Sequence, residues 1–432
     1  LMTRNLGVDG YGTFSTWINT ADLLFWIFFS ALTKCNTYYL SVNKVSISNF
    51  KRKYYIRYVI PALIAVTIIA ALIGKSGYCI IFLITGLELF TLDQSSTLLT
   101  QRHQVISLVG EYVLGRLILV LGLIGLQGIG KLSLRGLMLL YVFQYLVIIV
   151  LFLVFRKVKM EKGQDISENV SLKKWGSYQR ADIIQSMIAQ MPVLVQYVFS
   201  GAFEAGVVSV VLTVKKMINF ISGPSAKVFL PEFSRLYRNG EKEKIRGCYA
   251  SIMRIQMLFA GPLSVVLIGY PEVVLRILAD KLVEYRFIFV MCSVVFILTA
   301  TLGPCSGLLQ MTGNENKDNL FREIALVMMF VVMWLFRKDS LFVLYGLCAQ
   351  ALLESMGKYY YVCKWMQRGP VKLSTYLSWW LWPGIAIALT YLMHWEKSLL
   401  YMIFCAGIVF CVGAVSELKK EGGIREILRK KK

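Results

Sequence analysis

The sequence predicts an all-α polytopic membrane protein, and three observations lead to this prediction. Of the 432 residues, 57% are hydrophobic and only 17% are charged, whereas soluble domains carry about 25% charged residues. The apolar residues form long runs. Each run has about 20 residues, which is the length that a helix needs to cross a bilayer. The basic residues, which give a formal net charge of +22, lie mostly in short loops between these runs, so the charge indicates membrane topology rather than nucleic-acid binding.

Thirteen apolar runs are predicted to cross the membrane as helices, because lipid offers no partner for unpaired backbone groups. They cover residues 12–34, 55–74, 78–100, 104–126, 134–155, 180–200, 204–229, 249–269, 286–311, 320–336, 340–362, 374–393 and 398–416. Most of the 47 Lys and Arg residues fall in alternate loops, to which Lys51, Lys157 and Lys358, for example, are assigned. By the positive-inside tendency these loops and the C-terminus are cytoplasmic, and residues 1–11 lie outside.

An internal repeat is indicated by a short turn that occurs twice. Three residues recur 194 positions later: Gly7, Gly12 and Ser15 return as Gly201, Gly206 and Ser209. The span at 180–200 precedes the second copy, so we expect one further N-terminal span before the first copy and fourteen spans in the full-length protein. Two six-helix bundles in the same orientation form a parallel repeat. We expect an N-lobe at 1–155 (helices 2–6), a cytoplasmic linker at 156–178, a C-lobe at 179–366 (helices 7–12), and two further helices with a basic tail at 367–432.

Polar residues follow one face of the helix after each copy of the turn. Asn19 and Asp22 lie on the first helix, and Thr213, Lys216 and Asn219 lie on the second. A lipid-facing stripe of this kind would be unfavourable, so both faces are expected to line a wet interior. By the 194-residue shift, Asp22 corresponds to Lys216.

Two points remain open for these polar faces. Asp22 and Lys216 could instead form a structural ion pair between helices. Lys215 points about 100° away from Lys216 around the helix, so the two lysines cannot serve one role equally.

The nine cysteines form no CxxC pair and the two histidines lie far apart, so neither a metal site nor a cofactor is expected.

Three segments resemble polysaccharide-unit flippases of the Wzx type, within the multidrug/oligosaccharidyl-lipid/polysaccharide (MOP) exporter superfamily. The segment TRNLGVDGYGTFS is similar to the exterior turn of that family, and FLPEFSRLYRNGEKEKIR at 229–246 is similar to a segment after its eighth helix. GLLQMTGNENKDNLFR at 307–322 is similar to the segment after the tenth helix. The motif residues in the first two segments are Arg4, Gly7, Tyr11, Gly12, Pro231, Ser234 and Gly240.

The resemblance implies a MATE-like transporter and not an enzyme. It implies that two lobes rock about a central cavity and flip undecaprenyl-pyrophosphate-linked oligosaccharides across the bacterial cytoplasmic (inner) membrane, for O-antigen, capsule or exopolysaccharide export. Lys216 is the first choice for the pyrophosphate contact and Lys215 the second, and Asp22 is the candidate for coupling to a proton or sodium gradient. The expected partners are the lipid-linked oligosaccharide, membrane lipids, and the polysaccharide polymerase and chain-length proteins.

Two other functions compete with this interpretation. A MATE-type multidrug or cation antiporter has the same fold, although lysines in the cavity disfavour organic cations. A membrane polysaccharide polymerase or glycosyltransferase would need a sizeable exterior loop with acids and arginines. The longest predicted exterior loop, near 270–285, is short and partly apolar.

Overall fold

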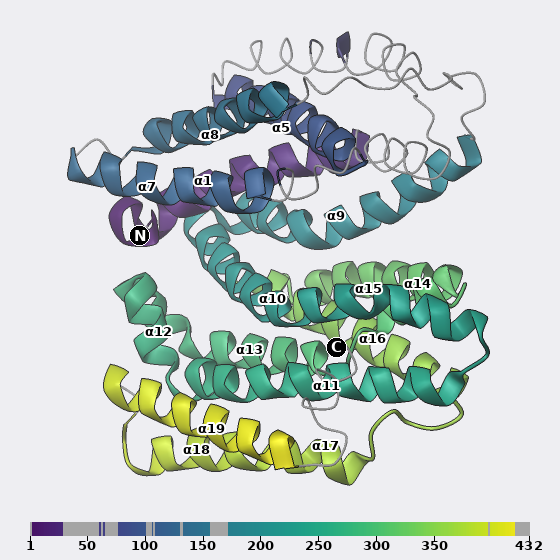
Figure 1. The fold of residues 1–432 in the computed structure, drawn as a ribbon. Coiled ribbons are helices and arrows are strands. Elements are labelled where there is room, and N and C mark those ends of the chain that lie inside the picture. The colour runs from purple at the N-terminus through teal and green to yellow at the C-terminus, as the bar shows by residue number, and fades with distance from the viewer. Residues whose placement is uncertain are drawn as a thin grey trace. The chain divides into compact units, whose positions relative to one another are not determined.

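The computed structural model describes residues 2–28, 60–61, 64, 77–100, 106, 109–129, 133–155, 172–395 and 398–419. In this part of the chain the regular secondary structure is helical throughout (Figure 1), which confirms the predicted all-α fold class. The chain divides into two compact units, Leu1–Gly206 and Val207–Lys432. Most of the predicted span 55–74 and most of the predicted linker 156–178 lie outside the described residues, and the predicted lobe boundaries stay a prediction.

The first unit packs around α1 (Met2–Phe28). Helix α9 (Leu172–Ser200) runs along α1, and α5 (Gly77–Thr100) packs against both α1 and α8 (Leu134–Phe155). A π-helical turn at Val109–Leu114 leads into α7 (Gly115–Gly128), which packs on α8. Apolar side chains from α1, α5 and α8 form the core between them; its buried members include Phe14, Ala21, Ile84, Leu137 and Met138.

The two copies of the repeated turn have a common backbone feature. Helix α1 is broken at Gly7, which has φ 74° and ψ 170°, and Gly201, with φ 104°, separates α9 from α10 (Ala202–Arg238). Positive φ at these values is adopted readily only by glycine. Equivalent positions of the repeat thus both place a left-handed glycine between two helical segments, which supports the repeat that the sequence predicts.

The second unit contains the rest of α10 and the helices that follow it. These are α11 (Lys242–Ser264) with a π-helical turn at Val265–Gly269, α12 (Pro271–Leu278), a 3₁₀ turn at Asp280–Tyr285, α13 (Arg286–Ala300), α14 (Cys305–Met311), α15 (Glu315–Leu335), α16 (Phe342–Trp365), α17 (Leu373–Trp379), α18 (Leu381–Leu392) and α19 (Leu399–Lys419). α15 and α16 form an extensive antiparallel pair, and α19 packs along α11. One hydrophobic core of this unit is built around Phe233, Tyr249, Ile252, Met253 and Leu308.

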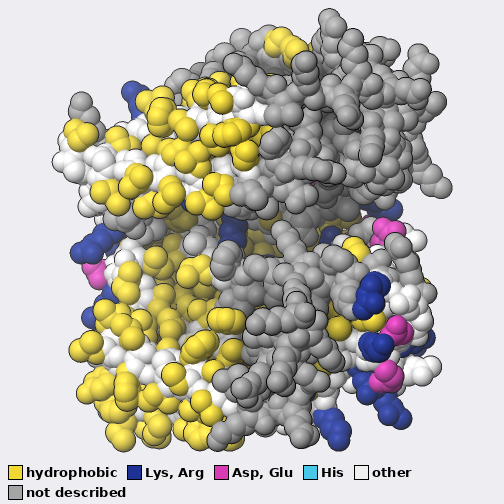
Figure 2. Space-filling model, in the orientation of Figure 1, with side chains coloured by type: hydrophobic (Ala, Val, Ile, Leu, Met, Phe, Trp, Pro, Cys, Tyr) yellow, Lys and Arg dark blue, Asp and Glu magenta, His cyan; other side chains and the backbone are white. Residues whose placement is uncertain are grey.

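Five helical stretches in the described residues are long and apolar enough to cross a membrane: Leu134–Phe155, Asp182–Ser200, Lys242–Gly269, Asp280–Met311 and Leu399–Ser416. Hydrophobic side chains also cover the outer surface of α18 and α19 (Figure 2). Leu392 and Leu400 are exposed there, as are Ile403 and Phe404. Such surfaces are unfavourable in water and are compatible with lipid. This distribution agrees with a multi-pass membrane protein.

Candidate functional site

On the polar face of α1, Asp22 contacts helix α9. Gln190 Nε2 of α9 donates to Asp22 Oδ2 over 3.3 Å. Asn19 is buried, and its amide donates to the backbone oxygen of Ser15 over 2.7 Å and to the Ser15 hydroxyl over 3.1 Å. Asn19 is therefore engaged with its own helix, whereas Asp22 is half-buried and connects two helices of the first unit.

The polar face of α10 is exposed in the second unit. Thr213, Lys216 and Asn219, which follow one another at steps of three residues, are all exposed. Lys215 behaves differently, because its Nζ lies 5.0 Å from the centre of the Phe296 ring of α13, within the range of a cation–π contact. The structure therefore gives the two adjacent lysines different surroundings. Asp22 belongs to the first unit and Lys216 to the second, and their predicted pairing stays a prediction.

The motif residues of the first turn surround a close helix crossing. A β-carbon at Gly12 would lie 1.8 Å from the carbonyl oxygen of Ala202, and a β-carbon at Gly206 would lie 2.3 Å from the carbonyl oxygen of Val8. Gly7 breaks the helix, Arg4 is exposed and Tyr11 is half-buried. Small residues permit this approach of two helix backbones. In this turn the motif glycines have a structural role.

The second motif occupies the end of α10 and the turn after it. Pro231 and Ser234 lie within α10, which continues to Arg238 instead of ending near residue 229 as expected. Gly240 has φ 73° and begins the turn into α11. This is the position and conformation in which glycine commonly ends a helix. The motif therefore marks a helix end and its turn.

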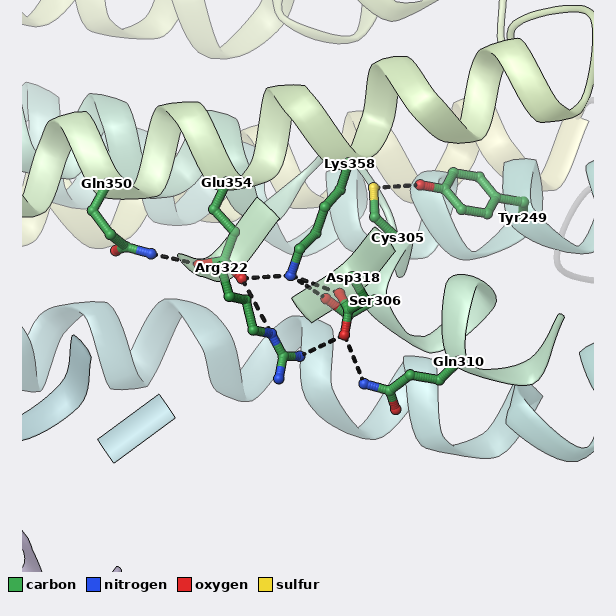
Figure 3. A network of polar contacts seen from close by, with 9 residues as sticks. All are labelled: Tyr249, Cys305, Ser306, Gln310, Asp318, Arg322, Gln350, Glu354 and Lys358. Carbon is green, nitrogen blue, oxygen red and sulfur yellow. Dashed lines mark hydrogen bonds and ion pairs between the residues drawn. The ribbon is translucent and has the colours of Figure 1, made fainter. Parts of the chain in front are cut away.

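A buried ionic network in the second unit was not predicted as a site (Figure 3). Lys358 of α16 is only 2% exposed, and its Nζ lies 2.7 Å from Asp318 Oδ1 of α15 and 2.6 Å from Glu354 Oε1 of α16. Arg322 Nη2 lies 3.0 Å from Asp318 Oδ2. Figure 3 shows these side chains from α15 and α16 converging on one another. The two acids and two bases balance in formal charge.

Neutral side chains complete the network. The Lys358 ammonium also donates to Ser306 Oγ of α14 over 2.9 Å, and Gln310 Nε2 of α14 donates to Asp318 Oδ2 over 2.9 Å. Gln350 donates to the second oxygen of Glu354. An unpaired charge at this depth would be strongly unfavourable, so the network joins α14, α15 and α16 in one arrangement.

Sequence reasoning placed Lys358 in a cytoplasmic loop, and that placement is wrong because the residue is buried within α16. A signal for the network was present in the sequence. Asp318 and Arg322 have opposite charges four residues apart, as do Glu354 and Lys358, on two consecutive helices. Such spacing places each pair on one helical face. The pattern alone does not distinguish an exposed pair from a buried one.

Comparison with solved structures identifies the fold. The chain is similar to the lipid II flippase MurJ in an inward closed conformation, with a TM-score of 0.68 and 12% sequence identity over 96% of this chain and 94% of the flippase. It is also similar to an inward-facing multidrug resistance MATE family transporter of the MOP superfamily, with a TM-score of 0.61 and 13% identity over 84% of this chain and 91% of the transporter. No protein-family model and no curated protein matches the sequence.

At sequence identities of 12% and 13%, the structural similarity to these two transporters establishes the fold alone. The chain has a MATE-like, all-α fold, which it shares with these two transporters. This confirms the fold class that the sequence predicts.

Proposed function

We propose that this protein is a transporter that flips undecaprenyl-pyrophosphate-linked oligosaccharides across the bacterial cytoplasmic membrane by alternating access. The observation that carries the proposal is the likeness to a lipid II flippase over 96% of this chain. A charged glycan head group cannot cross hydrocarbon unaided, because a buried unpaired charge is strongly unfavourable. A protein cavity with polar walls removes this barrier while the lipid tail stays in the bilayer.

The polar face of α10 supports the choice of cargo. Lys216 is exposed between Thr213 and Asn219 on this face, and an ammonium binds pyrophosphate oxygens through charge-assisted hydrogen bonds. Lys215 is the second candidate, although its contact with the Phe296 ring directs it into the second unit. Asp22 is our candidate for ion coupling, with Gln190 as its neighbour.

The test is a replacement of Lys216 in cells that depend on this protein for surface polysaccharide. Lys216→Ala should reduce glycan export at least tenfold while the amount of membrane-inserted protein is unchanged. The matched control is Lys244→Ala, since Lys244 is an exposed lysine of the same unit beside Glu241. Normal export by the Lys216 variant would refute the assigned role.

A multidrug antiporter is the second candidate function, and the likeness to a MATE family transporter favours it. The two proposed functions predict different effects when the protein is deleted from cells. Loss of an antiporter would sensitise cells to cationic drugs and leave surface glycan intact, whereas loss of a flippase would remove the glycan.

A further inference from the structure

A groove on the second unit runs between α11 and the C-terminal helices α17, α18 and α19. Its volume is about 310 Å³, and its wall includes Leu258 of α11, Leu381 and Trp382 of α18, and Val409 of α19. Leu381 and Trp382 are exposed, as is much of the outer apolar surface of α18 and α19 (Figure 2). Such a surface is compatible with lipid, so a lipid molecule can enter the groove from the side.

Close contacts between α11 and α19 show how the residues of the groove are aligned. A β-carbon at Gly261 of α11 would lie 3.4 Å from Val409 of α19. A β-carbon at Gly413 of α19 would lie 3.2 Å from Leu258 of α11. The two helices are therefore antiparallel, and a step back along α11 corresponds to a step forward along α19.

One end of the groove is polar. The antiparallel alignment, continued by about one helical turn, places Arg254 of α11 level with Ser416 of α19, and both residues line the groove. Arg254 is half-buried, and it is the only charged residue in the wall as far as the structure describes it. Ser416 is exposed. This end therefore offers a guanidinium and a hydroxyl group side by side.

The wall formed by α17 and α18 follows the same order. A β-carbon at Gly261 would lie 3.2 Å from Pro383 of α18, and the Thr390 hydroxyl of α18 lies 3.2 Å from the Tyr270 hydroxyl beyond the end of α11. Because α18 is thus parallel to α11, Ser378 of α17, which also lines the groove, lies at the polar end.

The other end of the groove is apolar and lies deeper in the membrane. Gly261 of α11 and Val409 of α19 line it. Ser416 at the polar end is the last residue of the stretch Leu399–Ser416, which is apolar enough to cross a membrane. The polar end therefore lies at the edge of the hydrocarbon region, and the apolar end points toward its interior. A phospholipid is oriented in the same way, with its headgroup at the edge and its acyl chains inside.

The charges in the wall indicate the class of lipid. The guanidinium of Arg254 can bind phosphate oxygens through two parallel charge-assisted hydrogen bonds. Ser378 donates its hydroxyl hydrogen to the backbone oxygen of Thr375 over 2.8 Å, so it offers a headgroup only an acceptor. The described wall contains no acidic side chain that would hold the ammonium group of a zwitterionic lipid. The groove therefore favours a headgroup with net negative charge.

We propose that this groove binds one anionic phospholipid of the bilayer, with its phosphate on Arg254 and Ser416 and the start of one acyl chain between Gly261 and Val409. The volume is at the lower end of the range for small-molecule sites, so the groove takes only part of the lipid. On the predicted topology the polar end faces the cytoplasmic leaflet, which carries anionic lipids. The described wall includes no residue of α10, so the inference does not depend on the proposed cargo contact.

The test is native mass spectrometry of the purified full chain with phosphatidylglycerol or phosphatidylcholine of matched acyl chains. We expect phosphatidylglycerol to bind at least fivefold more tightly, and Arg254→Ala to reduce its affinity to that of phosphatidylcholine. Arg246→Ala is the matched control, because Arg246 lies on the same helix and contacts Glu243 outside the groove. It should bind like the wild type. Ser416→Glu places a carboxylate level with Arg254 at an exposed position; it should also remove the preference, and it serves as the test if Arg254→Ala does not fold.

Four results would overturn the proposal. Equal affinity of the wild type for the two lipids would remove the charge preference, and an unchanged preference in Arg254→Ala or Ser416→Glu would remove the assigned contact. Displacement of phosphatidylglycerol by soluble glycerol 3-phosphate would identify a site for a free anion that needs no acyl chain. Tighter binding of undecaprenyl phosphate, lost in Arg254→Ala, would assign the groove to the cargo lipid instead of a lipid of the bilayer.

Discussion

Gly12 and Gly206, 194 positions apart, make equivalent contacts on the two sides of one helix crossing. Gly12 packs against the backbone of Ala202, and Gly206 packs against the backbone of Val8. Val8 and Ala202 are themselves 194 positions apart, so the contact is reciprocal in the way that two-fold symmetry requires. The repeat is therefore visible as a packing contact as well as a sequence pattern.

We expect Gly12→Ala to lower the stability of the protein in detergent by about 1–3 kcal/mol, because the added methyl group meets backbone atoms that cannot rotate away. Gly125→Ala is the control, since a β-carbon at Gly125 on α7 meets nothing within 4 Å. Thermal unfolding followed by circular dichroism measures both variants. Equal midpoints for Gly12→Ala and the wild type would contradict the close crossing.

Gly7→Ala should destabilise for a different reason. A β-carbon at Gly7 meets nothing within 4 Å, so the penalty comes only from the backbone conformation at φ 74° and ψ 170°. This region is almost closed to other residues, and occupying it costs about 1–3 kcal/mol. Gly128→Ala adds a methyl group in equally open space within helix α7 and should be neutral or stabilising. Stability measurements that rank the two variants in the opposite order would contradict the assigned geometry.

Lys358→Met should be among the most destabilising single changes in the second unit. It leaves the buried Asp318 and the half-buried Glu354 near each other without the ammonium, and breaking a buried pair in this way costs about 3–5 kcal/mol. Adding Glu354→Gln removes the one excess negative charge, because Arg322 still pairs with Asp318, and should restore most of the loss. The control is Lys364→Met at an exposed position of the same helix. Failure of the Lys358→Met, Glu354→Gln double variant to regain thermal stability would indicate that the network acts through packing rather than charge.

Asp22→Asn tests the ion-coupling proposal. The amide can still hydrogen-bond to Gln190, so we expect a normal amount of folded protein. In reconstituted vesicles the variant should lose the stimulation of transport by a proton or sodium gradient. Asp9→Asn, at an exposed position of the same helix, should keep it. Stimulation that survives Asp22→Asn would exclude this carboxylate as the coupling site.

The pattern of apolar runs and turn glycines along the sequence predicts much of the fold. Apolar runs indicated the helices, and the turn at Gly7 and Gly201 indicated the repeat, because positive φ demands glycine at both places. The break after Ala300 was missed because the apolar run continues through it, although Gly303 and Pro304 were a signal. The contact between Asp22 and Gln190 and the network around Lys358 join residues from different helices. Such contacts depend on tertiary packing, which the spacing of residues along one helix does not specify.

Reconstitution tests most directly whether this protein flips lipid-linked glycans, as we propose. Purified protein would be placed in vesicles that carry undecaprenyl-pyrophosphate-linked oligosaccharide in the inner leaflet, and translocation would be scored by access of an external glycan-binding probe. We expect the wild type to expose the glycan at least tenfold faster than protein-free vesicles, and Lys216→Ala to abolish most of this difference. Glycan exposure by the wild type at the rate of protein-free vesicles, with and without an ion gradient, would contradict the account.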